Sequence, residues 1–230
     1  LTMSRFNPLG LTKHSGPKHT ATLIFFHGSG SNGPHMLEWV TLMHKAFTFP
    51  HIKVMYPTAP LQPYTPAGGQ RSNVWFDRAD VTRNVPEQLE SINKIEREVR
   101  KLIEEENSAG IPTNRIVVGG FSMGGALAFY TGYRWLHDVA GVFAFGSFLN
   151  VNSKVFEDLK STSDKLPPLL QIHGDNDDVV DLTWAQDTFQ DLKKLGVSGE
   201  FHVRERLGHA VDRKGMTLIK EFVEKLLPNI

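Results

Sequence analysis

Cysteine is absent from all 230 residues of the chain. Its absence excludes disulfides, cysteine-ligated metal sites, a thiol nucleophile and palmitoylation of the chain itself. Any covalent catalysis must therefore use another nucleophile, and serine is the first residue type to examine.

The sequence also lacks a surplus of charge of either sign, because 25 basic residues balance 25 acidic ones. A neutral chain gives no electrostatic reason to expect a nucleic acid or an anionic membrane as a partner. No run approaches the ~18 apolar residues of a membrane span, and the first twenty residues lack the apolar core of a signal peptide. We therefore expect no nucleic-acid partner, no stable membrane insertion and a cytoplasmic location, while the oligomeric state stays open.

Short apolar segments alternate with helical patterns along the chain. The segments that read as strands are 21–26, 52–56, 115–119, 141–145, 169–172 and 200–205. Helical periodicity is clearest over 86–107, with Pro86 in the first turn, and in the last segment around Met216 to Leu226. This alternation predicts an α/β fold with a mostly parallel central sheet and helices on both faces. The length fits one domain over 1–230, with an irregular segment over 1–19 and no large cap domain.

Residues 57–72 break this pattern, because they are rich in proline and glycine. The segment follows a predicted strand, at the edge where ligands collect in open α/β sheets. We expect it to form a loop that partly covers the site, with Leu61 and Tyr64 as substrate contacts.

The most informative motif is Gly120-Phe121-Ser122-Met123-Gly124, which joins a short apolar strand to a small-residue helix. This G-x-S-x-G pattern is typical of a nucleophile elbow, in which a strained turn exposes the serine Oγ and glycines leave room for it. The motif predicts Ser122 as the nucleophile.

A serine nucleophile needs a base and an acid, and in hydrolases with parallel α/β sheets the acid and then the histidine follow the serine in the chain. His209 fits the base because it lies in a glycine-containing loop before the terminal helix, unlike His173 and His202 in strand segments. An acidic turn after the strand at 169–172 offers three acids, Asp175, Asp177 and Asp178.

Another class of protein is suggested by Gly28-Ser29-Gly30-Ser31-Asn32-Gly33, which matches the G-x-G-x-x-G dinucleotide fingerprint. That fingerprint needs an acidic residue at the end of the second strand, about 20 positions on, to bind ribose hydroxyls. The second strand here ends at Tyr56-Pro57 without a carboxylate. His27-Gly28 instead suits a hydrolase loop that supplies an oxyanion-hole amide, so the hydrolase interpretation is favoured.

Five motifs in order resemble the acyl-protein thioesterase and lysophospholipase family of α/β-hydrolases, and its lysophospholipase-like branch most of all. They are His27-Gly28-Ser29-Gly30, Ser72-Asn73-Val74-Trp75-Phe76-Asp77, Gly119 to Gly125, His173-Gly174-Asp175-Asn176-Asp177 and Gly208-His209. The resemblance implies an α/β-hydrolase fold and, through the pattern H-G-x-x-D, selects Asp177 as the acid. It also implies substrate contacts near Trp75 and Phe76.

The predicted function is a serine hydrolase that cleaves carboxylic esters or thioesters through Ser122, Asp177 and His209, without cofactor or metal. The backbone amides of Ser29 and Met123 would form the oxyanion hole. Substrates would be small esters or thioesters, or S-acylated proteins. A lysophospholipase, a peptidase and a non-catalytic binding module on the same fold are the alternatives.

Overall fold

The computed structural model describes residues 19–230, so the irregular segment expected over 1–19 falls outside the described residues except at its last position. The core is a parallel sheet of six strands in the order β2-β1-β5-β6-β7-β8. The strands are β1 (Ala21–Phe26), β2 (Ile52–Met55), β5 (Ile116–Phe121), β6 (Gly141–Phe145), β7 (Leu169–Gly174) and β8 (Gly199–Arg204). All six segments that the sequence predicts as strands are strands.

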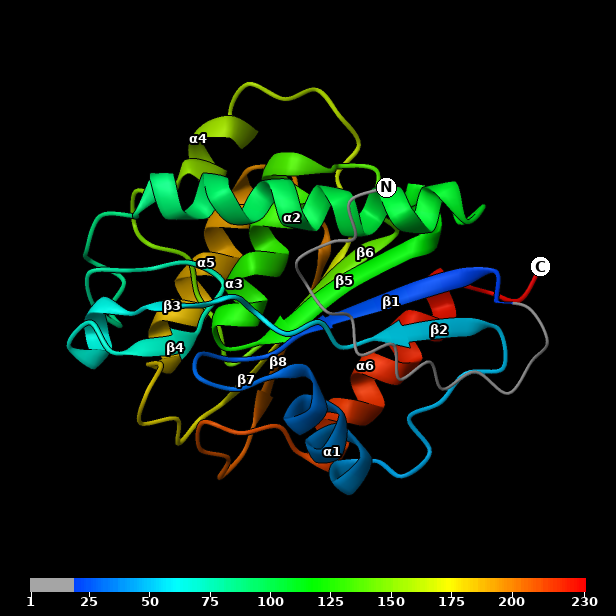
Figure 1. The fold of residues 1–230 in the computed structure, drawn as a ribbon, viewed down its shortest axis with the longest axis horizontal. Helices are drawn as coiled ribbons and strands as arrows, with labels where there is room; N and C mark the ends of the chain where they lie inside the picture. The colour runs from blue at the N-terminus through cyan, green and yellow to red at the C-terminus, as the bar shows by residue number, and fades with distance from the viewer. Residues whose placement is uncertain (1–18) are drawn as a thin grey trace.

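Helices cover both faces of the sheet, with α1 and α6 on one face and α2 and α3 on the other (Figure 1). The helices are α1 (Gly33–Met43), α2 (Leu89–Ser108), α3 (Met123–Tyr130), α4 (Lys154–Leu159), α5 (Leu182–Lys194) and α6 (Arg213–Leu226). A π-helical turn, Thr131–Trp135, continues α3, and a 3-10 turn, Thr113–Arg115, precedes β5. The expected α/β-hydrolase fold is confirmed.

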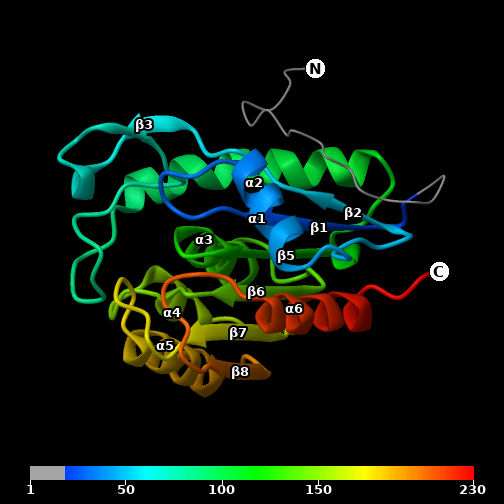
Figure 2. The same ribbon diagram turned by 90° about the horizontal axis from the view of Figure 1, so that it is seen from below.

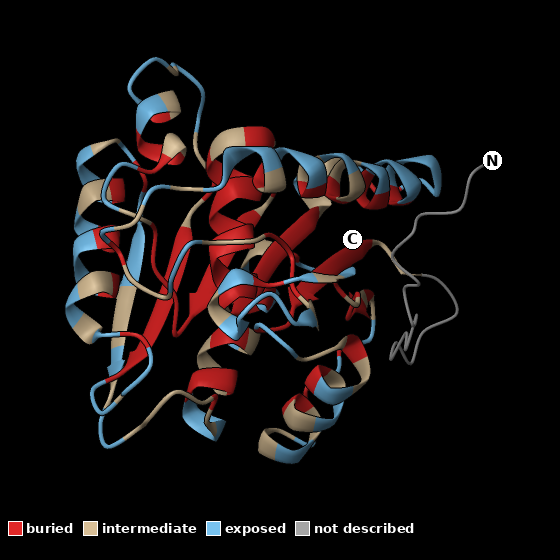
Figure 3. Cartoon of the chain, turned by 60° about the vertical axis from the view of Figure 1, so that its left-hand side comes forward, coloured by how far each residue is buried: buried red, intermediate tan, exposed pale blue. Residues whose placement is uncertain are grey.

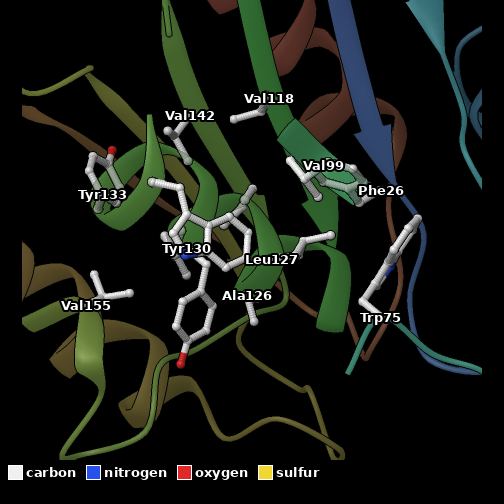
Figure 4. Close-up of a cluster of buried hydrophobic side chains, with 14 of the residues drawn as sticks. Phe26, Trp75, Val99, Val118, Ala126, Leu127, Tyr130, Tyr133, Val142 and Val155 are labelled. Atoms are coloured by element: carbon white, nitrogen blue, oxygen red, sulfur yellow. The ribbon is translucent and has the colours of Figure 1, made fainter. Parts of the chain in front are cut away.

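The central strands are mostly apolar because both of their faces are buried. In β1, Ile24 and Phe26 pack with α2 and α3, whereas Leu23 and Phe25 pack with α1 and α6. Figure 3 shows the buried central strands between helices whose outer faces are exposed. Figure 4 shows part of the core on the α3 side, where Leu127 of α3 belongs to the same cluster as Val99 of α2 and Val118 of β5.

The predicted start of the long helix differs from the structure. Helix α2 begins at Leu89, so Pro86 precedes the helix and does not lie in its first turn. Glu87, one of the two residues between them, forms an isolated bridge with Arg78, and its carboxylate accepts hydrogen bonds from the Tyr130 hydroxyl and the Lys154 amide. These tertiary contacts hold the segment in an extended form before the helix starts.

The segment predicted as a loop over 57–72 contains a small antiparallel hairpin, β3 (Leu61–Pro63) and β4 (Arg71–Asn73), around a 3-10 turn (Thr65–Ala67). In both ribbon views the hairpin lies outside the central sheet, at the end where α2 begins (Figures 1 and 2). Asp77 fixes its tip by accepting hydrogen bonds from the amide and hydroxyl of Thr65, at 2.8 and 2.6 Å. Over residues 19–230, none of the helices combines the length and apolar character that crossing a bilayer requires.

Candidate active site

Four of the predicted site residues lie in loops that follow parallel strands. Ser29 follows β1, Ser122 follows β5, Asp177 follows β7 and His209 follows β8. Ser147, which the sequence did not single out, follows β6. Since all these strands are parallel, the loops meet at one edge of the sheet. The chain order also reverses there, because β2 and β5 flank β1 on opposite sides. Such a switch point is where ligands bind in open α/β sheets.

Ser122 occupies a strained turn between β5 and α3, with φ of 54° and ψ of −121°. This conformation is uncommon for a residue with a side chain, and two hydrogen bonds support it. The Ser122 amide donates to the Phe145 carbonyl at 2.8 Å, and its carbonyl accepts from the Gly125 amide at 2.9 Å. A Cβ on Gly124 would lie 2.2 Å from the Phe26 carbonyl oxygen, so the motif's last position has no space for a side chain.

His209 and Ser122 are within hydrogen-bonding distance, with 3.0 Å between His209 Nε2 and Ser122 Oγ. On the other side of the ring, His209 Nδ1 lies 2.8 Å from Asp177 Oδ2. The carboxylate can only accept, so Nδ1 carries the proton and Nε2 is left to accept from the serine hydroxyl. The ring also packs against Phe121, with centroids 4.7 Å apart. This is the geometry that a general base and its nucleophile need.

Asp177 is buried, with its side chain 1% exposed. Burial opposes ionisation, but hydrogen bonds from His209 and from the amides of Val180 and Val179 outweigh it and hold the pKa of Asp177 below its usual value. The two amides donate to Oδ1 at 2.8 and 3.0 Å, which leaves Oδ2 for His209. His173 Nε2 is a more distant neighbour of Oδ2, at 3.4 Å.

The other two acids of the turn occupy different positions. Asp175 accepts the Arg206 amide at 2.6 Å, on an exposed part of the loop. Asp178 is exposed as well. Of the three acids that the residues alone left open, the structure brings Asp177 to His209.

The sequence predicts that the backbone amides of Ser29 and Met123 form an oxyanion hole beside Ser122. Ser29 and Met123 both line the cavity that contains Ser122. Within residues 19–230, neither amide has a hydrogen-bond acceptor, although the neighbouring amides of Gly30 and Ser31 donate to Asn73 and Gly28 carbonyls. Unpaired N–H groups beside a nucleophile can bind a developing oxyanion.

His27 and Trp75 fix the loop that carries Ser29. The Trp75 indole N–H donates to the His27 carbonyl at 2.7 Å, and the Ala59 amide donates to His27 Nε2 at 2.9 Å. His27 Nδ1 must then carry the proton, and it donates to the Gly28 carbonyl at 2.7 Å. Burial lowers the pKa of His27 to about 4, against the hydrogen bond to Gly28 and with the help of nearby His35.

A cavity of about 380 Å³ opens over Ser122. Of the four predicted substrate contacts, only Tyr64 lines it. Leu61 lies on β3 and is 53% exposed, away from the cavity. Trp75 is 1% exposed and its indole donates to the His27 carbonyl, while Phe76 packs in the core against Tyr130. For these three residues, substrate contact is not supported.

Several residues of the cavity wall were not predicted from the sequence. They are Met36 and Trp39 on α1, Arg78 and Val81 after the Trp75 motif, Phe148 after β6, and Val179 and Val180 after Asp177. Arg78 directly follows the Ser-Asn-Val-Trp-Phe-Asp run. Its position next to this motif is the feature of the sequence that could have identified it as a cavity residue. In the described part of the chain, no group of three or more His, Asp or Glu side chains could hold a metal ion.

The sequence and the fold of this chain are similar to those of known ester hydrolases and thioesterases. Residues 11–227 match the family described as phospholipase/carboxylesterase. The mouse (Mus musculus) lysophospholipase-like protein 1 is 44% identical over 212 residues, covering 92% of this chain and 89% of its own. Acyl-protein thioesterase 1 homolog 1 of Dictyostelium discoideum is 36% identical, covering 91% of this chain and 92% of its own. The crystal structure of Zea mays acyl-protein thioesterase 2 superposes with a TM-score of 0.81 at 27% identity, covering 91% of this chain and 95% of its own.

Proposed function

The chain belongs to the phospholipase/carboxylesterase family of ester hydrolases, and from this premise we propose that it cleaves carboxylic esters or thioesters through an acyl-enzyme on Ser122. The observation that carries the proposal is the chain of contacts from Ser122 Oγ to His209 and from His209 to Asp177, at 3.0 and 2.8 Å. The family likeness supports the reaction class, and the contacts support the roles of the residues.

In the first half-reaction, Ser122 Oγ attacks the substrate carbonyl carbon while His209 Nε2 takes the hydroxyl proton. Negative charge then moves to the carbonyl oxygen. The amides of Ser29 and Met123 are available to stabilise it, because both residues line the cavity and neither amide has a hydrogen-bond acceptor within residues 19–230. As the carbon–oxygen or carbon–sulfur bond breaks, His209 returns the proton to the leaving alcohol or thiol.

In the second half-reaction, water takes the place of the leaving group. His209 removes a proton from the water, the resulting hydroxide attacks the acyl carbon, and Ser122 Oγ leaves with the proton that His209 returns. Asp177 stabilises the imidazolium in both halves, because its buried carboxylate stays ionised and in contact with Nδ1. The product is a free carboxylic acid and an unmodified enzyme.

The size of the cavity supports short and medium acyl groups. Its volume of about 380 Å³ is near the lower end of the range for small-molecule sites, and Tyr64, Trp39 and Phe148 form parts of its wall. Acyl groups of two to eight carbons would be cleaved better than palmitoyl groups, so an S-acylated protein is a weaker substrate than a small ester or thioester.

The test compares wild type and Ser122→Ala on p-nitrophenyl esters of increasing acyl length, kept below micelle-forming concentrations. We expect kcat of Ser122→Ala to fall by roughly six orders of magnitude. For wild type, kcat/KM should rise about fourfold for each buried methylene and then level off or decline beyond medium chains.

A fluorophosphonate probe provides the matching control, because it should label wild type and leave Ser122→Ala unlabelled. Persistent labelling of the variant would refute Ser122 as the nucleophile. A steady rise of kcat/KM out to the palmitoyl ester would refute the short-chain preference and favour depalmitoylation instead.

A further inference from the structure

Arg78 brings a positive charge into the catalytic cavity. Apart from the His209 imidazole, the cavity wall formed by the described residues is otherwise uncharged: it consists of apolar, aromatic, serine and glycine residues. A cation in an apolar cleft is costly unless an anion compensates for it. Among the described residues that line the cavity, Arg78 is the one lysine, arginine, aspartate or glutamate.

The guanidinium of Arg78 makes no hydrogen bond and no ion pair with any of residues 19–230. Its Nε is buried and without a partner. It contacts two aromatic rings instead, with its central carbon 5.3 Å from the Phe76 centroid and 5.6 Å from the Phe148 centroid. The five N–H donors of this guanidinium thus have no acceptor among the described residues.

The carboxylates nearest to Arg78 are occupied elsewhere. Asp77 accepts both the amide and the hydroxyl of Thr65, and Glu87 accepts the Tyr130 hydroxyl and the Lys154 amide. They still act on Arg78 at longer range. Burial lowers the pKa of the Arg78 guanidinium, while Tyr64, Tyr130, Asp77 and Glu87 oppose that effect, and arginine remains protonated under these conditions.

A second polar group in the cavity wall is also unused. Ser147 is 1% exposed and lines the cavity, and its Oγ has no hydrogen-bond partner within the described structure. Ser147 directly precedes Phe148, the ring that Arg78 contacts. Buried polar groups are ordinarily hydrogen-bonded, so two unsatisfied groups on one cavity wall indicate a ligand that satisfies them.

We propose that Arg78, with Ser147, binds a carboxylate or phosphate group of the substrate while the substrate's ester or thioester carbonyl lies at Ser122. The planar guanidinium fits either anion through paired N–H donors, and the Ser147 hydroxyl can donate one more hydrogen bond. The substrates of this site are then small esters or thioesters that carry an anionic group on the acyl or the leaving side. This inference rests on the proposed function and adds the substrate class.

The experiment measures a ratio of kcat/KM values for anionic and neutral substrates of matched size. On the acyl side, p-nitrophenyl hydrogen adipate is compared with p-nitrophenyl hexanoate, with spontaneous hydrolysis subtracted. On the leaving side, butanoylglycerol phosphate is compared with butanoylglycerol by release of butanoic acid. Wild type should prefer the anionic member of at least one pair, by about tenfold to a hundredfold.

Arg78→Met keeps the length and apolar stem of the side chain and removes the charge. We expect it to reduce the wild-type ratio about tenfold or more, and Ser147→Ala to reduce it severalfold. The ratio is insensitive to the fraction of folded enzyme, because both members of a pair report on the same preparation. Arg97→Met is the matched control, since Arg97 is exposed on α2 and outside the cavity, and it should keep the wild-type ratio.

The pair that shows the preference identifies the side of the substrate that carries the anion. A wild-type ratio of one or less in both pairs would overturn the proposal, as would a ratio that is the same in Arg78→Met and wild type. In either case, hydrolysis of the neutral esters by wild type would leave the proposed function standing. Failure to hydrolyse any of the four substrates would contradict the proposed function itself.

Discussion

At the scale of the residue, the role of an acid depends on which of its oxygens is free. The turn after β7 offers Asp175, Asp177 and Asp178 within four positions, and composition does not separate them. In the structure, two backbone amides bind Oδ1 of Asp177 and thereby direct Oδ2 to His209. These two hydrogen bonds hold the Asp177 side chain in one rotamer, and Oδ2 therefore stays in contact with His209.

Asp177→Asn is expected to lower kcat on a simple ester by about 10⁴, because an amide can hold His209 in the wrong tautomer and cannot stabilise the imidazolium. Asp175→Asn and Asp178→Asn serve as matched controls, and each should reduce kcat by less than about tenfold. Steady-state kinetics at neutral pH provide the measurement. If Asp175→Asn were the most damaging of the three, the assignment of the acid would be wrong.

Sequence patterns were more informative about chemistry than about contacts at this scale. Motifs and chain order predicted Ser122 and His209, and the family resemblance selected Asp177. In the structure His209 lies within hydrogen-bonding distance of both other residues. By contrast, Trp75 was expected at the substrate and instead supports the His27 carbonyl from within the core. A motif shows that a residue is near a site, whereas the direction of its side chain follows from tertiary packing that no local pattern contains.

At the scale of the element, the close contact between α3 and β1 determines where Ser122 lies. The start of α3 approaches the end of β1 so closely that Gly124 has no room for a side chain, since its Cβ would be 2.2 Å from the Phe26 carbonyl oxygen and 2.7 Å from that of His27. Backbone atoms cannot give way as the end of a flexible side chain can. The glycine therefore allows the helix to present its first amide, that of Met123, beside the nucleophile.

Gly124→Ala is expected to cost about 3 kcal/mol or more in the free energy of unfolding, because α3 must move away from β1. Gly68→Ala is the control: Gly68 has a positive φ of 65° but open space around it, so only backbone strain of about 1 kcal/mol applies. Urea denaturation of both variants would show the difference. Equal losses of stability would mean that the close approach to β1 does not constrain the elbow.

The elements themselves were predicted unevenly, for identifiable reasons. The buried strands β1 and β6 begin and end where their apolar runs predicted, because burial on both faces requires continuous apolar residues. The β3–β4 hairpin was missed because each strand has three residues, all exposed or half-buried, and β3 ends at Pro63. Its pairing and its hydrogen bonds to Asp77 join residues eight to twelve positions apart, and proline and glycine content alone does not reveal which residues pair.

At the scale of the whole molecule, buried histidines make the stability depend on pH. Burial lowers the pKa of His27 to about 4 and also lowers that of His173. In the unfolded chain a histidine titrates near 6.5. As pH falls from 6.5 towards 4, the unfolded state therefore gains protons that the folded state does not bind, and the free energy of unfolding decreases.

Between pH 7 and pH 5, His27 alone should account for a loss of about 2 kcal/mol in the free energy of unfolding. The effect of the carboxylates with lowered pKa, Asp177 among them, belongs to a more acidic range, because it begins only as pH approaches their unfolded values. Urea unfolding of wild type and His27→Gln at the two pH values measures the contribution. If the variant lost as much stability as wild type, His27 would bind protons equally in the folded and unfolded states, and its lowered pKa would be refuted.

The distance along the chain between the catalytic groups has a consequence for folding kinetics. Ser122 and His209 are separated by 87 residues, and the loop that carries His209 follows β8, an edge strand that pairs with β7 alone in the described sheet. Such long-range contacts form late, since closing a long stretch of chain has an entropic cost before any contact compensates for it. Esterase activity should therefore recover during refolding only after β8 has paired with β7. A folding intermediate in which the central strands have already formed would still be inactive.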